Sequence, residues 1–156
     1  MVGPYPEDVN EHFAPEINPD PGKQVPAGDI GEPAPTFLNW QRVPLNSTGF
    51  LDFRGLFGYA EHNSAYALLK IYCPKQQSVN ILLGANQVRL WLNGHQIHEN
   101  LTQRAAFPDS DVIAATLNPG WNTLLARVVN VTGTHAMYLR LSDAPADLAK
   151  TGERTK

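Results

Sequence analysis

The chain has 156 residues, enough to enclose one hydrophobic core without a metal ion or a disulfide. Twelve Lys and Arg residues against 15 Asp and Glu residues give a formal charge of -3, which argues against nucleic-acid binding. The single cysteine, Cys73, excludes an internal disulfide and a cysteine zinc site. No apolar run reaches the roughly 20 residues of a membrane helix, so we expect no membrane insertion. The first residues also lack the pattern of a signal peptide.

The first 36 residues contain too much proline and glycine for a helix of appreciable length. Scattered apolar residues, such as Phe13 and Val25, favour a loop that lies on a surface over a disordered tail. We therefore predict a long Pro-rich loop over about residues 5–36.

From Phe37 onward, short runs of β-branched, leucine and aromatic residues alternate with turn residues, which is typical of strands. We predict nine strands, at 37–43, 50–53, 65–73, 78–84, 87–93, 95–98, 111–117, 122–130 and 136–142. The clearest turns are Asn93-Gly94 and Asn118-Pro119-Gly120. The pattern predicts an antiparallel β-sandwich as one domain over residues 1–143, with a C-terminal tail over 144–156.

The alternation of side chains along a strand assigns two faces. The inward set is Ala67, Leu69, Ile71, Cys73, Val79, Ile81, Leu83, Val88, Leu90, Leu92, Leu124, Ala126, Val128, Met137, Leu139 and Leu141. The outward set combines cations with aromatic rings: Tyr66, Lys70, Tyr72, Arg89, Trp91, Arg127, Tyr138 and Arg140. Cys73 is therefore expected to be buried and unpaired.

The run VRLWLNGHQIHEN, the turn LNPGWN and the strand HAMYLRLSD resemble the galactose-binding-domain-like β-sandwich modules of secreted bacterial multidomain proteins. The opening VGPYPED is similar to the first-strand segment of many such modules. The resemblance spans about residues 2–143 and implies a jelly-roll sandwich. It implies function weakly, because these modules include both sugar-binding and architectural domains.

Catalytic patterns are weak. The acidic residues Glu7, Asp8, Glu99, Asp109 and Asp111 lack a recognisable partner for glycoside hydrolysis, and we interpret Asp109 and Asp111 as part of a turn before a strand. His95 and His98 are expected on opposite faces of a strand, where they could not share a metal ion. We predict no enzyme activity, no metal and no cofactor.

The outward set could form a glycan groove, because aromatic rings stack on sugars and Arg or Lys can bond their hydroxyl or carboxylate groups. Alternatively, the N-terminal loop covers this face, and its complementary charges favour that arrangement. In the covered case, a site would move to loops at the edge of the sandwich. The ligand-binding candidates are Tyr66, Arg89, Trp91 and Arg127 on the face, and Trp40, Tyr59, His62 and Trp121 in the loops.

The leading hypothesis is a non-catalytic accessory module that binds carbohydrate within a larger secreted protein, in the extracellular space or the periplasm. The alternative is a structural or interaction domain that packs against neighbouring domains and binds no small ligand.

Overall fold

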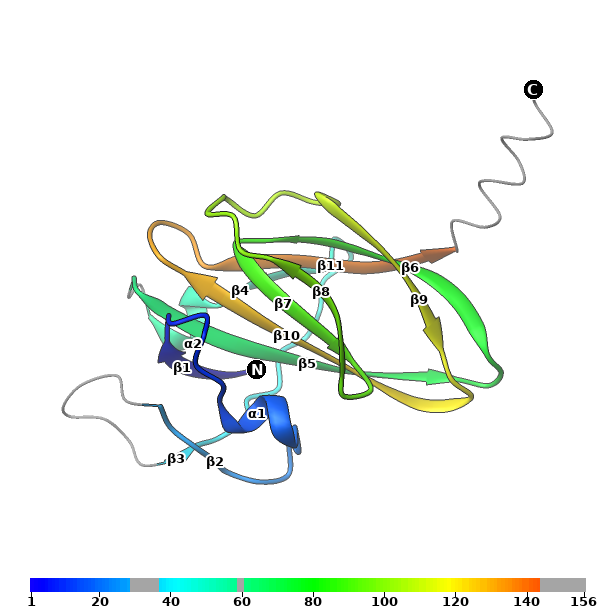
Figure 1. Ribbon diagram of the computed structural model, residues 1–156, viewed down its shortest axis with the longest axis horizontal. Coiled ribbons are helices and arrows are strands. Elements are labelled where there is room, and N and C mark those ends of the chain that lie inside the picture. The colour runs from blue at the N-terminus through cyan, green and yellow to red at the C-terminus, as the bar shows by residue number, and fades with distance from the viewer. Residues whose placement is uncertain (29–36, 59–60, 144–156) are drawn as a thin grey trace.

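The computed structural model describes residues 1–28, 37–58 and 61–143. The predicted tail over 144–156 and Tyr59 lie outside the described residues. Two antiparallel sheets pack face to face and a third, small sheet lies beside them, so the fold is an all-β sandwich as predicted (Figure 1).

The larger sheet has five strands and the smaller has four. In spatial order, the five are β1 (Val2–Pro6), β5 (Asn63–Cys73), β10 (Gly120–Asn130), β7 (Gln87–Leu92) and β8 (His95–Asn100). The four are β4 (Phe50–Asp52), β11 (Ala136–Asp143), β6 (Gln77–Ala85) and β9 (Asp111–Leu117). The small third sheet consists of β2 (Val25–Pro26) and β3 (Phe37–Leu38).

The predicted inward residues all belong to the core between the two main sheets or its margin, and the core also contains residues outside that set, such as Phe53, Ile113 and Leu117. Leu90 and Leu92 are buried, Arg89 lies on the other face of β7, and Cys73 is a buried free thiol, as predicted. Leu69, Ile71 and Leu141 are partly buried at the margin of the same core. The two-residue period therefore gave the correct strand faces, because neighbours in a strand point to opposite sides of the sheet.

The tight hairpin also forms as predicted. Asn93 and Gly94 have φ angles of 50° and 83°, and Leu92 pairs with His95 across the turn. Both central residues of a type I′ turn need positive φ, which Asn and Gly tolerate best.

The strand prediction fails at two places. The predicted strand over 37–43 ends at Leu38, and Gln41 instead donates a backbone hydrogen bond to the Met1 carbonyl at 2.7 Å. The predicted Pro-rich loop over 5–36 includes strand residues of β1 and β2 and one helical turn, α1 (Ala14–Ile17). Pro15 suits the start of this turn, and Pro19 follows its end at Asn18. A second short helix, α2 (Arg54–Phe57), follows β4.

Candidate functional site: a covered face and an aromatic pair

Four of the predicted face residues lie together on the outer face of the five-stranded sheet. Arg127 of β10 is directly opposite both Tyr66 of β5 and Arg89 of β7, and Trp91 follows two residues after Arg89. Tyr138 and Arg140 were wrongly placed with them, because they belong to β11 in the other sheet. The alternation of side chains identifies two faces of a strand but does not say which sheet contains it.

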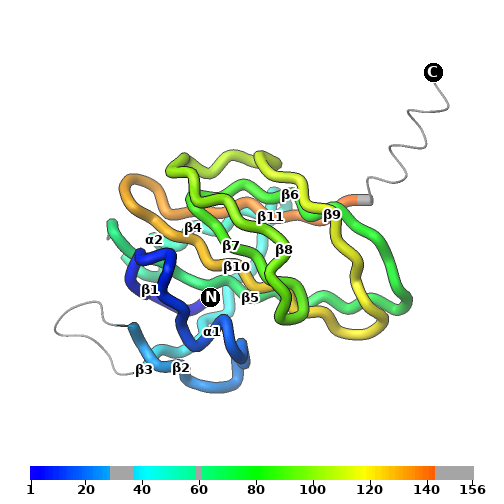
Figure 2. Tube along the Cα trace, in the orientation of Figure 1, coloured from blue at the N-terminus to red at the C-terminus, as the bar shows by residue number. Residues whose placement is uncertain are grey.

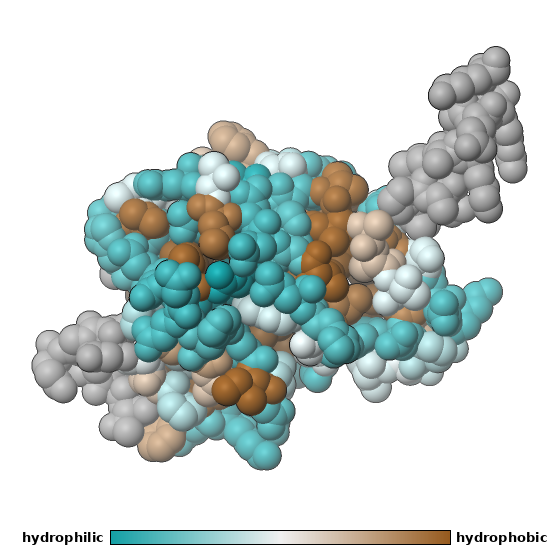
Figure 3. All heavy atoms as spheres, in the orientation of Figure 1, coloured by the Kyte–Doolittle hydropathy of each residue, from teal (hydrophilic) through white to brown (hydrophobic). Residues whose placement is uncertain are grey.

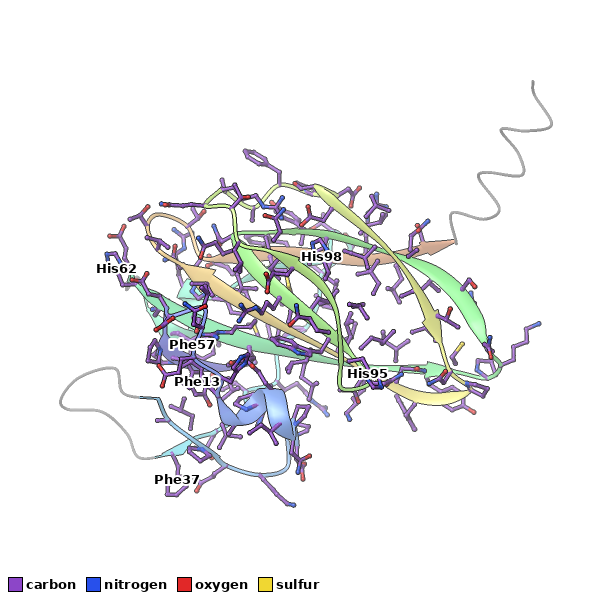
Figure 4. The ribbon with its side chains drawn as sticks, in the orientation of Figure 1. Phe13, Phe37, Phe57, His62, His95 and His98 are labelled. Atoms are coloured by element: carbon purple, nitrogen blue, oxygen red, sulfur yellow. The ribbon has the colours of Figure 1, made fainter. Side chains whose placement is uncertain are left out.

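The segment after β1, residues 7–28, covers this face, and we call it the N-terminal cover (Figure 1). Its apolar side chains form a second cluster with the sheet, outside the main core. The cluster contains Val2, Tyr5, Phe13, Val25, Leu38, Tyr66, Trp91 and Leu125. Phe13 is labelled in Figure 4, where it lies beside the sheet at the N-terminal side of the molecule.

Arg127 holds the cover in place. Its side chain is 1% exposed, and its guanidinium donates to the main-chain carbonyls of Glu11 at 2.6 Å, Asp8 at 2.8 Å and Pro6 at 3.2 Å. The Phe13 ring centroid lies 4.9 Å from the guanidinium carbon, a cation–π arrangement. A buried cation is tolerated only with partners of this kind, so Arg127 is committed to the fold.

The polar groups of Tyr66 and Arg89, beside Arg127, are also occupied by hydrogen bonds within the fold. The Tyr66 hydroxyl donates to the Glu16 carboxylate at 2.6 Å, and Glu16 lies 3.5 Å from the Arg127 guanidinium. Burial, opposed by the nearby Arg127 charge, raises the pKa of Tyr66, which keeps the phenol protonated as a donor. Arg89 donates to Glu99 at 2.5 Å and to the carbonyl of Val9. The arrangement in which the N-terminal segment covers this face is therefore confirmed, and these four residues do not form an open groove.

The loop candidates do not converge on one site. His62 precedes the first residue of β5 and lies 3.1 Å from the Glu7 carboxylate, whereas Trp121 pairs with Tyr72 near the last residue of that strand. The span of β5 between them is about 33 Å for a strand of 11 residues. Trp40 is half-buried against the cluster beneath the cover.

Trp121 lies within a strand and forms an exposed aromatic pair with Tyr72. The two residues are directly opposite each other on β10 and β5, with ring centroids 5.4 Å apart. Their relative exposures are 70% for Trp121 and 62% for Tyr72. The pair lies on the outer face of the five-stranded sheet, on the part of β5 and β10 far from β1. We call it the aromatic platform.

A polar pair flanks the platform on the same face. Lys70 and Thr123 are the next outward residues along the two strands, and the Lys70 amine donates to the Thr123 hydroxyl at 2.9 Å. Sequence analysis placed Tyr72 on the outward face but did not select it as a site residue. Only the register of β5 against β10 reveals that it faces Trp121.

Three of the five candidate catalytic carboxylates have an arginine partner. Asp109 pairs with Arg140, Glu99 with Arg89, and Asp111 with Arg104. A hydrogen bond from Arg140 lowers the pKa of Asp109, whose φ of 57° places it in the turn before β9, as interpreted from the sequence. Burial would raise the pKa of Asp111, but hydrogen bonds from Arg104 and His98 lower it overall. These carboxylates are suited to bracing loops.

A β-bulge overturns the prediction for the two histidines of β8. Leu90 pairs with His98 and Trp91 with Gln96, so Ile97 is the extra residue, and both His95 and His98 lie opposite inward leucines. The two side chains nevertheless lie apart, because they belong to different parts of β8 (Figure 4). His98 lies 3.1 Å from Asp111. Within residues 1–28, 37–58 and 61–143, no group of three potential ligands could hold a metal ion.

Apolar surface is also visible between β8 and β9, at the open edge of the sandwich (Figure 3). A hollow of about 560 Å³ lies there, with Val79, Leu92, Ile97 and Ala115 in its walls and His95 at its rim.

Comparison with protein-family models, curated proteins and solved structures gives no match to this chain. In the described part of the chain, none of the helices has the length and apolar character needed to cross a membrane.

Proposed function

We propose that the protein is a non-catalytic carbohydrate-binding module and that the aromatic platform is its sugar-binding surface. The observation that carries the proposal is the exposure of two neighbouring aromatic rings on paired strands, with their planes inclined at 63° to each other. Stacking on the apolar face of a sugar ring uses rings of this kind, and a platform built on strands needs no ordering when the ligand binds.

The groups beside the platform support the same chemistry. The Lys70 amine and the Thr123 hydroxyl lie on the neighbouring cross-strand pair, where they can bond sugar hydroxyl or carboxylate groups. Among the described residues, β1 pairs only with the first part of β5, so the edge of β5 beside Tyr72 has no strand partner there. An extended glycan could therefore lie across the two strands.

The sandwich fold and the sequence motifs are also compatible with a galactose-binding-domain-like jelly roll. In this proposal the domain is part of a larger exported protein, extracellular or periplasmic, and its activity is to hold that protein on a glycan.

The second candidate is an interaction domain whose platform packs against a neighbouring domain. The ion pairs of the acidic residues favour the interaction domain. Carboxylates often bond sugar hydroxyls, but Glu99, Asp109 and Asp111 are already paired with arginines. Buried aromatic residues are also frequent anchors of protein interfaces.

A glycan array probed with the labelled 156-residue chain tests the proposal. Binding to a defined glycan class is expected, and Trp121→Ala or Tyr72→Ala should weaken it about tenfold or more, a loss of about 1.4 kcal/mol. Phe107→Ala is the matched control, because Phe107 is 66% exposed but lies in the loop before β9. Absence of any glycan binding, or an equal effect of all three changes, would favour the interaction domain.

A further inference from the structure

A second binding site is formed by a cavity of about 550 Å³ beside β5. Its inner walls are apolar and come from both main sheets. They include Leu51, Leu69, Leu124, Ala126, Met137 and Leu139. Small-molecule sites in proteins have volumes of roughly 300–1,000 Å³ and similarly apolar walls. The cavity is therefore large enough for a small ligand.

The cavity exists because one side of the sandwich is incompletely closed. The register of β1 along β5 reaches no further than Tyr66, and in the described part of the chain no strand pairs with the same edge of β5 from Ala67 to Cys73. The connection from β3 to β4, cyan in Figure 2, runs from the small sheet to the four-stranded sheet. It contributes Gln41, Arg42, Val43 and Leu45 to the outer wall. An irregular segment cannot fill the space as a paired strand would.

The rim of the cavity is cationic. Arg42 is exposed and has no ion-pair or hydrogen-bond partner among the described residues, and Lys70 also borders the opening. The nearby carboxylate of Asp20 is engaged by Lys23 at 3.4 Å. An apolar interior with free positive charge at its mouth matches a ligand that has a hydrocarbon chain and an anionic head.

We propose that this cavity binds a single-chain carboxylate of the fatty-acid type. The hydrocarbon chain lies along the edge of β5, against Val43, Leu45 and Leu69, and the carboxylate is held at the rim by Arg42. The cavity and the aromatic platform share Lys70, but the carboxylate contact is assigned to Arg42 and the sugar-stacking contact to Trp121 and Tyr72. Arg42→Gln and Trp121→Ala therefore test the two proposals separately.

Titration calorimetry with decanoate, dodecanoate and tetradecanoate tests whether the cavity binds the hydrocarbon chain of the ligand. Each is used below the concentration at which it forms micelles. We expect one ligand per chain, and affinity that rises about fourfold for each methylene, the equivalent of about 0.8 kcal/mol. Dodecanol, which lacks the charge, should bind about tenfold more weakly than dodecanoate. Lack of saturable binding, or equal affinity for dodecanol and dodecanoate, would overturn the proposal.

Two substitutions test the place of binding. Arg42→Gln should weaken dodecanoate several-fold and leave dodecanol unchanged, whereas Lys75→Gln removes a charge in the β5–β6 turn and should change neither. Ala67→Leu should fill part of the cavity and reduce binding of both ligands. If that variant does not fold, Arg42→Gln still decides, since unchanged dodecanoate affinity in Arg42→Gln contradicts the site.

Discussion

Arg127 and Glu11 are 116 positions apart in the sequence, yet the Arg127 guanidinium donates to the Glu11 carbonyl at 2.6 Å. The acceptor is backbone, so the contact depends on the path of the N-terminal cover more than on the side chain at position 11. The same guanidinium also bonds the carbonyls of Pro6 and Asp8. One side chain of β10 therefore fixes the end of β1 and two points of the N-terminal cover, which has little regular structure of its own.

Replacing Arg127 should loosen the cover and destabilise the fold. Arg127→Gln cannot reach all of these carbonyls, and it removes the arginine beside the buried Glu16 carboxylate, which then has only His12 as a basic neighbour among the described residues. We expect a loss of about 3–5 kcal/mol in the free energy of unfolding, measured by chemical denaturation. Amide hydrogen exchange should also become faster in residues 7–28.

Arg140→Gln is the control for that measurement. Arg140 pairs with Asp109 at the surface, with 56% of its side chain exposed, and an exposed pair contributes about 0–1 kcal/mol. Equal destabilisation by the two substitutions would mean that Arg127 does not hold the cover.

Trp91→Ala should lower stability and leave glycan binding intact. Trp91 is 8% exposed and packs in the cluster beneath the cover, so its truncation should cost about 3–5 kcal/mol. Trp121→Ala should show the opposite pattern, with a stability change within about 0.5 kcal/mol and weaker glycan binding. A stable Trp91→Ala protein that had lost sugar binding would contradict the covered arrangement.

The alternation of apolar and polar residues along a strand was sufficient to predict which face of the sheet a side chain occupies. Leu90 and Arg89 are adjacent, and alternation alone placed the first in the core and the second outside it. The bulge at Ile97 has no comparable signal, because the extra residue is defined by pairing with β7. Local pattern therefore could not place His95 and His98 on the same face.

Pairing between distant segments was the other source of error. Tyr138 has the alternation of an outward residue, but its sheet depends on β11 pairing with β6 and β4. The aromatic platform depends in the same way on the register that puts Trp121 opposite Tyr72. Complementary charge in the first 36 residues did predict the cover, but the contacts differ from those expected. Of the described residues in this segment, only Glu16 brings a carboxylate to Arg127, and the other acceptors there are backbone carbonyls, which charge patterning cannot reveal.

Gly84→Ala should displace the loop before β9. A Cβ at Gly84 would lie 1.6 Å from the carbonyl oxygen of Phe107 and 2.5 Å from its carbonyl carbon, and backbone atoms cannot move aside alone. We expect destabilisation of about 1–3 kcal/mol or more in thermal or chemical unfolding. Gly55→Ala is the matched control, since a Cβ there meets no atom within 4 Å. Similar stability of the two variants would show that the loop does not pack on β6 in this way.

The buried imidazole of His135 should make stability depend on pH between its ordinary pKa and a lower value. His135 is 2% exposed, its ring stacks on Phe53 at 4.7 Å between centroids, and its Nε2 lies 2.9 Å from the Val128 carbonyl oxygen. Burial lowers the pKa of His135 from its usual 6.5, although the hydrogen bond to Val128 opposes the shift.

The folded protein therefore holds His135 neutral at pH values where the unfolded chain already binds a proton. Its contribution is fully present above pH 6.5 and is lost as the pH falls from 6.5 toward the folded-state pKa, by at most about 1.4 kcal/mol per pH unit. The lowered pKa values of Asp52 and Asp111 act in a different window, because those carboxylates lose their contribution only below about their usual 3.8. Urea unfolding at pH 7.5, 6.5, 5.5 and 5.0 should show the decline, and His135→Gln should flatten it. His95→Gln, at an exposed position, should retain the wild-type slope, and a slope that survives in His135→Gln would assign the effect to another group.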